Sequence, residues 1–232
     1  MPEIIINGSE GRLEGRYHHS EFKGAPIAIV LHPHPLYGGT MNNKIVYRLY
    51  HMFAQNGFSV LRFNFRGIGK SQGSYDEGVG ELTDAATALD WLQTQNPDAP
   101  TCWIGGFSFG AWISLQLLMR RPEIEGFVAV SPPANLYDFS FLAPCPAAGL
   151  ITQGDKDDVV NEDLVSKLAA KLGSNQATSV EYKLINGADH YYRGVEDELG
   201  NAVNDYIARR MADFKQKRKI RPDRKRRQLP RD

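Results

Sequence analysis

The sequence is poor in cysteine. Its 232 residues include only Cys102 and Cys145. Two cysteines are too few for a disulfide framework in a chain of this length, so the composition excludes the disulfide-dense secreted scaffolds. Cys102 lies in an apolar run and is interpreted as a core residue.

Long hydrophobic runs are also missing. No apolar stretch approaches the roughly 18 residues that a membrane-spanning helix needs. The N-terminal residues Met1–Ile4 are not a basic segment followed by an apolar one, as a signal peptide would be. The sequence therefore predicts no membrane partner and a cytoplasmic location.

Net charge is absent overall but not locally. The chain has 27 basic and 27 acidic residues, which implies no general attraction to nucleic acids or acidic membranes. Residues 215–232, however, hold ten lysines and arginines against two aspartates. We expect one domain over residues 1–214 and a basic, disordered tail over residues 215–232, because such a charge run cannot pack a core. This tail is the one feature that could contact nucleic acid.

Short apolar runs alternate with helix-like segments along most of the chain. This alternation is typical of βαβ units, so it predicts an α/β fold with a mostly parallel central sheet and helices on both faces. The first 24 residues are expected to form an antiparallel edge. The predicted strands are 25–31, 58–65, 101–105, 126–130, 147–152 and 180–185, and the predicted helices are 40–56, 81–95, 109–121, 161–172 and 195–214.

The sequence Gly106-Phe107-Ser108-Phe109-Gly110 is a G-x-S-x-G motif between a predicted strand and a predicted helix. Its glycines permit a sharp strand-to-helix turn, which lifts a serine hydroxyl above the edge of the sheet. Ser108 is therefore a candidate nucleophile, and the N–H of Phe109 is a candidate oxyanion donor. The competing interpretation is a glycine-rich turn in which the serine only caps the helix.

A serine nucleophile needs a general base and a group that orients the base. His190 is the only histidine after Ser108, and it lies in the loop after the last predicted strand. Asp189 precedes it, but adjacent side chains rarely face each other well enough to bond. Three other aspartates share the loop after strand 147–152, namely Asp155, Asp157 and Asp158.

Four stretches of the chain resemble the α/β-hydrolase superfamily, and within it small bacterial hydrolases related to dienelactone hydrolases and carboxylesterases. They are residues 31–39 (LHPHPLYGG), residues 64–71 (NFRGIGKS), the motif around Ser108, and the loops with the aspartates and His190. The HPHP-x-x-GG loop is the most particular of these markers. The resemblance implies an α/β-hydrolase fold and a serine hydrolase that cleaves a small ester or thioester through an acyl-enzyme intermediate.

The resemblance also implies roles for particular residues. The family pattern G-D-x-D-x-V-V aligns with residues 154–160 and makes Asp157 the acid of a catalytic triad with Ser108 and His190. The usual position of the second oxyanion donor falls on the N–H of His34, with Leu36 as the next candidate. Residues 131–146, where a cap domain usually lies, are too few to build a large one, so we expect an open site.

Several alternatives remain open from the sequence. A peptidase could use the same triad, and a non-catalytic binding protein could keep the fold and the pocket. His32 and His34 could bind a metal, but two histidines without a third ligand form a poor site, so no metal and no cofactor is predicted. Arg66 and Lys70 could meet an anionic substrate or only hold their loop. A small-molecule substrate is the expected partner, whereas its acyl and leaving groups and the oligomeric state stay open.

Overall fold

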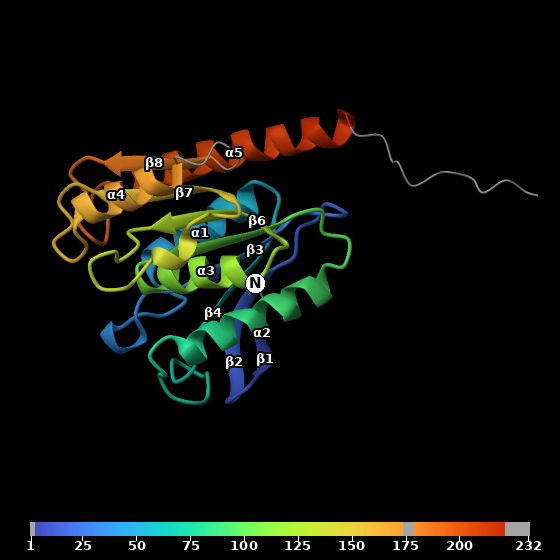
Figure 1. Ribbon diagram of the computed structural model, residues 1–232. Helices are drawn as coiled ribbons and strands as arrows, with labels where there is room; N and C mark the ends of the chain where they lie inside the picture. The colour runs from blue at the N-terminus through green and yellow to red at the C-terminus, as the bar shows by residue number, and fades with distance from the viewer. Residues whose placement is uncertain (1–2, 174–178, 221–232) are drawn as a thin grey trace, which may run out of the picture.

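The computed structural model describes residues 3–173 and 179–220. Its central feature is one sheet of eight strands in the order β1-β2-β4-β3-β5-β6-β7-β8. The predicted α/β-hydrolase fold, with a mostly parallel sheet and helices on both faces, is confirmed (Figure 1). The strands are β1 (Glu3–Gly8), β2 (Gly11–His18), β3 (Ile27–Leu31), β4 (Ser59–Phe63), β5 (Cys102–Phe107), β6 (Ile124–Val130), β7 (Ala148–Gly154) and β8 (Val180–Ile185).

The N-terminal edge of the sheet is antiparallel, as predicted. β1 pairs antiparallel with β2, and β2 pairs antiparallel with β4. All other neighbours in the sheet are parallel, and β3 pairs with both β4 and β5. The carboxyl ends of the parallel strands therefore meet at one edge of the sheet, where ligand sites of open α/β sheets form.

Five α-helices in the described part of the chain cover the two faces of this sheet. One face is covered by α1 (Lys44–Gln55) and α5 (Glu196–Ile220), which share a hydrophobic cluster. The other face is covered by α2 (Val79–Gln95), α3 (Phe109–Arg120) and α4 (Glu162–Gly173). None of the helices in residues 3–173 and 179–220 is both long and apolar enough to cross a membrane.

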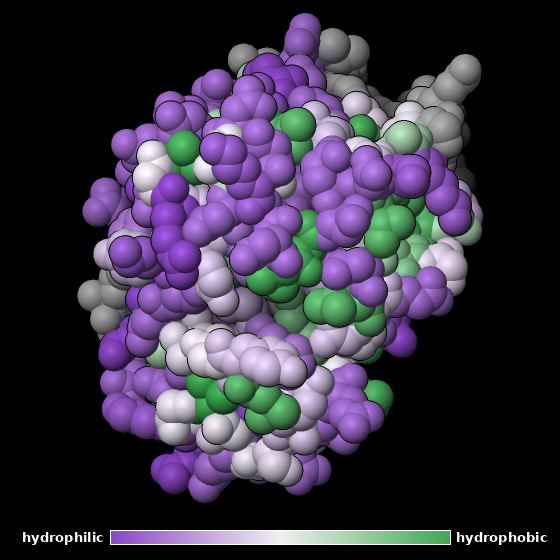
Figure 2. All heavy atoms as spheres, turned by 90° about the vertical axis from the view of Figure 1, so that its left-hand side faces the viewer, coloured by the Kyte–Doolittle hydropathy of each residue, from purple (hydrophilic) through white to green (hydrophobic). Residues whose placement is uncertain are grey.

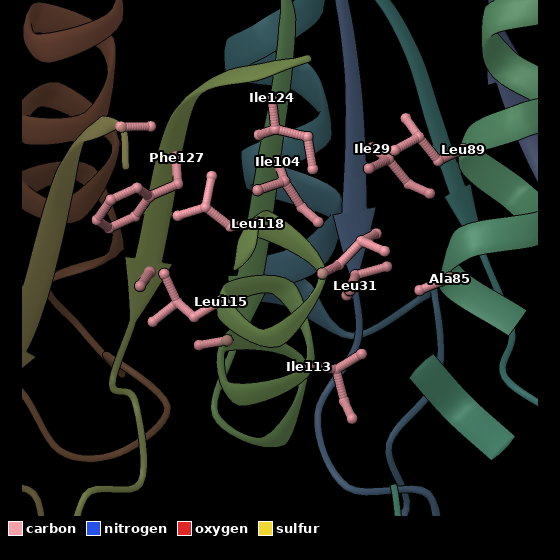
Figure 3. Close-up of a cluster of buried hydrophobic side chains, with 14 of the residues drawn as sticks. Ile29, Leu31, Ala85, Leu89, Ile104, Ile113, Leu115, Leu118, Ile124 and Phe127 are labelled. Carbon is pink, nitrogen blue, oxygen red and sulfur yellow. The ribbon is translucent and has the colours of Figure 1, made fainter. Parts of the chain in front are cut away.

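Helix α3 packs against the middle of the sheet and fixes the position of its own first turn. Figure 3 shows Leu118 of α3 beside Ile104 of β5, and both belong with Leu115 to one cluster of buried side chains. All six residues of β5 are buried, as expected for a central parallel strand with helices on both faces. The turn between β5 and α3 is thus held from both sides by the core.

Helix α5 extends beyond the boundary that the sequence predicted. It runs to Ile220, whereas the predicted domain ended at residue 214 and the tail began at residue 215. Residues 215–220 continue the helix because lysine, arginine and glutamine have high helix propensity and positive charge is favourable near a helix C-terminus. The rest of the predicted tail, residues 221–232, lies outside the described residues.

A buried ion pair holds the loop after β4 against α2. Asp84 accepts hydrogen bonds from the backbone N–H, Nε and Nη2 of Arg66 at 2.8–3.0 Å, and both side chains are almost fully buried. Lys70 instead pairs with Glu3 on the surface. Both cations are therefore used within the fold, which favours the loop-holding interpretation of Arg66 and Lys70 over contact with an anionic substrate.

We predict that Asp84→Ala lowers the free energy of unfolding by about 3 kcal/mol or more, because it leaves a buried guanidinium without its partner. The matched control is Asp90→Ala on the same helix, which removes an exposed ion pair with Arg121 and is expected to cost less than about 1 kcal/mol. Urea unfolding of the two variants measures both values. A loss of unfolding free energy in Asp84→Ala that is as small as the loss in Asp90→Ala would show that the Arg66–Asp84 pair does not stabilise this loop.

Candidate active site

Ser108 occupies a sharp turn between β5 and α3. Its φ of 54° lies in the left-handed region, which a non-glycine residue rarely adopts and which stores roughly 1–3 kcal/mol of strain. The turn also needs both flanking glycines. A Cβ on Gly106 would lie 2.3 Å from the carbonyl oxygen of Gly110, and a Cβ on Gly110 would lie 2.4 Å from that of Leu31. The G-x-S-x-G motif therefore permits a close backbone approach that larger residues would block.

The fold brings Ser108, His190 and Asp157 into one chain of hydrogen bonds. His190 Nε2 lies 3.2 Å from Ser108 Oγ, and His190 Nδ1 lies 2.8 Å from Asp157 Oδ2. Because Asp157 accepts at Nδ1, the neutral imidazole carries its proton there and presents Nε2 to the serine hydroxyl. The three residues come from loops after β5, β7 and β8 and are up to 82 residues apart in sequence.

The carboxylate of Asp157 is buried and held on both oxygens. Its Oδ1 accepts the backbone N–H groups of Val159 and Val160, and its Oδ2 accepts Nε2 of Gln153 besides His190. Burial acts to raise the pKa of Asp157, but the bond and charge interaction with His190 and the two backbone bonds outweigh it, so the pKa is lowered. Asp157 is thus ionised at neutral pH.

The competing aspartates make other contacts. Asp155 accepts the backbone N–H of Gly187, and Asp189 accepts those of Tyr191 and Arg193. Asp158 is exposed. The structure therefore brings only Asp157 of these four aspartates to His190.

Tyr192 holds the His190 loop in place. Its hydroxyl lies 3.1 Å from Ser131 Oγ and 3.2 Å from Thr152 Oγ1, at the ends of β6 and β7, and its ring is fully buried. Ser131 and Tyr192 also have positive φ angles, of 45° and 55°. Sequence reasoning missed these residues and Gln153, because their partners lie in other loops and no local pattern marks them.

Two backbone N–H groups remain available beside Ser108. The described residues provide no acceptor for the N–H of Phe109, at the start of α3, or for that of His34. Leu36, the second choice for an oxyanion donor, requires a correction. Its N–H already donates to Nδ1 of His34 at 3.2 Å, because the loop turns into a short 3-10 helix there. The geometry favours His34 over Leu36.

His32 is a structural residue. It is fully buried, its Nδ1 lies 2.7 Å from the carbonyl oxygen of Pro33, and its Nε2 accepts the N–H of Phe65 at 3.0 Å. Burial lowers the pKa of His32 to about 4, so the ring is neutral. Since both nitrogens are bonded to the backbone, His32 has no lone pair free for a metal, and His32 and His34 do not form the metal pair considered from the sequence.

A pocket of about 570 Å³ opens in front of Ser108 and His190. This volume is typical of sites for small organic molecules. Its walls come from the loop after β3, the start of α3, the segment after β6 and the loops of Asp157 and His190. Figure 2 looks onto the side toward which β6 and β8 point in Figure 1, and apolar side chains gather there around a hollow.

The fold and the serine turn define an α/β hydrolase, and comparisons with known proteins agree. The model of the X-Pro dipeptidyl-peptidase (S15) family matches residues 21–228, and the chain belongs to this family. The superfamily implied by the sequence is thus confirmed, whereas the narrower likeness to dienelactone hydrolases stays a prediction.

Three relatives illustrate the similarity. The chain is 53% identical to the uncharacterized protein RP471 of Rickettsia prowazekii, over 98% of both chains. It is 56% identical to ATU1826 of Agrobacterium tumefaciens, a protein of unknown function, with a TM-score of 0.89 over 91% of this chain and 97% of the other. It is 32% identical to XC6422 of Xanthomonas campestris, described as a serine hydrolase without a lid, with a TM-score of 0.80 over 90% and 94%.

The buried His32 predicts a pH dependence of stability. Its pKa is about 4 in the fold and about 6.5 in an unfolded chain, so the unfolded chain binds the extra proton as the pH falls between these values. The stability that His32 provides is complete above pH 6.5 and is lost by about 3 kcal/mol toward pH 4. The difference in unfolding free energy between wild type and His32→Gln should shrink by that amount, since the other titrating groups cancel. A difference that stays constant from pH 7 to pH 4 would contradict it.

Proposed function

We propose that this protein is a serine hydrolase that cleaves a small ester or thioester through an acyl-enzyme intermediate. The observation that carries the proposal is the chain of hydrogen bonds from Ser108 through His190 to the buried carboxylate of Asp157. Each role needs a particular group at a particular atom, and the three side chains meet these needs together.

The reaction proceeds in two halves. Ser108 Oγ attacks the carbonyl carbon, its proton passes to His190 Nε2, and the negative charge on the carbonyl oxygen is stabilised by the N–H groups of Phe109 and His34. The tetrahedral intermediate then breaks its bond to the leaving oxygen or sulfur, which takes the proton from His190. Water repeats the sequence on the acyl-serine and releases the acid. Asp157 stabilises the imidazolium that forms twice in this cycle.

Ester cleavage is favoured over the peptidase activity in the family's name. A dipeptidyl-peptidase acts at the free amino terminus of a peptide, and a desolvated ammonium group needs an anionic partner. No aspartate or glutamate is among the described residues that line the pocket. Asp157 could not serve as the anionic partner of such an ammonium group, because its carboxylate is buried and already bonded to His190. The pocket therefore suits a neutral acyl compound better than a charged peptide end.

A non-catalytic binding protein is the remaining competitor. It would not need the strained backbone of Ser108, which costs stability, or a buried carboxylate bonded to the imidazole that faces Ser108. Their joint presence supports catalysis.

A fluorophosphonate probe tests the nucleophile. Ser108 Oγ should form a bond to phosphorus, with release of fluoride and transfer of the hydroxyl proton to His190, and mass spectrometry should locate the adduct on the peptide that contains Ser108. Ser108→Ala should fold normally and lose both labelling and hydrolysis of a simple acetyl ester. Labelling at another serine, or full turnover by the folded variant, would refute the mechanism.

The acid is tested by amide substitutions in one loop. Asp157→Asn should reduce kcat on the order of 10⁴-fold, because the amide cannot stabilise the imidazolium and favours the wrong tautomer. Asp158→Asn, in the same loop but exposed, is the matched control and should keep near-normal kcat. Circular dichroism checks that both variants fold. If Asp158→Asn lost activity and Asp157→Asn kept it, the assignment of Asp157 as the acid would be wrong.

A further inference from the structure

The pocket in front of Ser108 has no charged wall. Fourteen described residues line it, and none of them is lysine, arginine, aspartate or glutamate. Its two histidines do not supply a fixed charge either, since burial lowers the pKa of His34 and His190 serves the proposed proton transfer. Arg193, which is not among the lining residues, stacks on the ring of Tyr191, but its charge is paired with that of Asp189. A charged acyl group would lose its hydration here without gaining a partner.

One wall of the pocket is a continuous row of aromatic rings. The ring centroids of Tyr37 and His34 are 4.7 Å apart, those of His34 and Phe109 are 4.9 Å apart, and those of Phe109 and Tyr137 are 5.9 Å apart. These rings come from the loop after β3, the first turn of α3 and the segment after β6. Trp112 stacks on Tyr137 at 4.2 Å from the side of α3.

In this aromatic wall, made of Tyr37, His34, Phe109 and Tyr137, hydrogen bonds fix the ring of His34. His34 Nδ1 accepts from Leu36, so the proton of the neutral ring lies on Nε2, which is 3.2 Å from the hydroxyl of Tyr75. A ring fixed in this way loses little side-chain entropy when a flat ligand binds.

The rim of the pocket exposes apolar surface. Leu136 is 61% exposed and Tyr37 is 81% exposed, although large apolar side chains usually avoid water. The hollow among apolar groups in Figure 2 shows the same feature. A volume of about 570 Å³ also exceeds the needs of an acetyl group and is of the size that binds drug-sized ligands.

The direction of the reaction decides which half of the substrate meets the aromatic wall. The leaving oxygen must face His190 Nε2, from which it takes a proton. The acyl group therefore points away from the His190 loop. The middle of the aromatic wall is formed by His34 and Phe109, the two residues whose N–H groups hold the carbonyl oxygen in the proposed mechanism. The acyl group thus lies along this wall.

We propose that the site selects an uncharged ester whose acyl group is an aromatic ring. This inference rests on the proposed function, since it assumes that Ser108 attacks an ester. Aromatic pairs in offset or edge-to-face geometry gain more than their buried area alone provides, which corresponds to roughly two- to tenfold in binding over a saturated ring of similar size.

The test compares methyl benzoate with methyl cyclohexanecarboxylate in wild type and variants. Each ester has its own intrinsic reactivity, so the measured quantity is the ratio of their kcat/KM values and its change on substitution. Tyr137→Leu and Tyr37→Leu should each lower the benzoyl preference about two- to tenfold. Because Tyr37 is mostly exposed, its variant should fold even if Tyr137→Leu does not. Tyr47→Leu, an exposed tyrosine on α1 outside this pocket, is the control and should leave the ratio unchanged.

The charge of the acyl group is tested with the monomethyl ester of terephthalate, which carries a carboxylate opposite the ester. Wild type should hydrolyse it far more slowly than methyl benzoate. Leu136→Arg, which adds a cation at the exposed rim, should reduce the difference in rate between the two esters.

Equal rates for the charged and neutral esters, or a benzoyl preference that neither tyrosine variant changes, would overturn the inference. If Ser108 still reacts with the fluorophosphonate probe and acetyl esters are cleaved, only this inference fails; if both are absent, the proposed function fails with it.

Discussion

The close backbone approach at the turn between β5 and α3 is the constraint on which the rest of the site depends. Gly110 sits where a Cβ would collide with the carbonyl oxygen of Leu31, so the first turn of α3 lies directly against the end of β3. This contact places the N–H of Phe109 beside the loop that carries His34. It also forces Ser108 into a strained conformation that the buried core on both sides maintains. The proposed nucleophile and the proposed oxyanion donors are thus positioned by one packing contact.

The other half of the site depends on polar groups that the fold buries with their partners. Asp157 is held by backbone N–H groups of its own loop and by Gln153, and the loop of His190 is tied to β6 and β7 through Tyr192. Lys156 N–H also donates to the carbonyl oxygen of Ala188, which joins the two loops directly. Hydrogen-bonded networks of this kind restrict side-chain motion, because a displaced member would lose its partner in a low-dielectric interior.

The two histidines of the loop after β3 have different roles, one in stability and one at the pocket. His32 is neutral, buried and bonded at both ring nitrogens, so it fixes its loop against the segment that follows β4. His34 faces the pocket, and its ring joins the aromatic row while its backbone N–H remains free for a ligand. Of the two histidines considered as metal ligands from the sequence, His32 therefore holds the loop in place and His34 lines the pocket. Their burial, which no sequence pattern reveals, separates the two roles.

The sequence by itself determined the fold class, the order of the elements and the turn at Ser108, because apolar periodicity and glycine placement are local properties. The predicted helix 40–56 began too early, because the side chain of Asn43 caps α1 by accepting the N–H of Ile45. The predicted end of the last helix, residue 214, was also too early, because residues of high helix propensity continue into the basic run. Only the tertiary structure decided which groups meet. The family pattern had pointed to Asp157, and the fold brings this aspartate, rather than Asp155 or Asp189, to His190. Leu36 donates its N–H to the side chain of His34, and Tyr192 bonds to Thr152 of β7 and to Ser131 just after β6, which are 40 and 61 residues away in sequence. These outcomes depend on distances between loops that only the completed sheet brings to one edge.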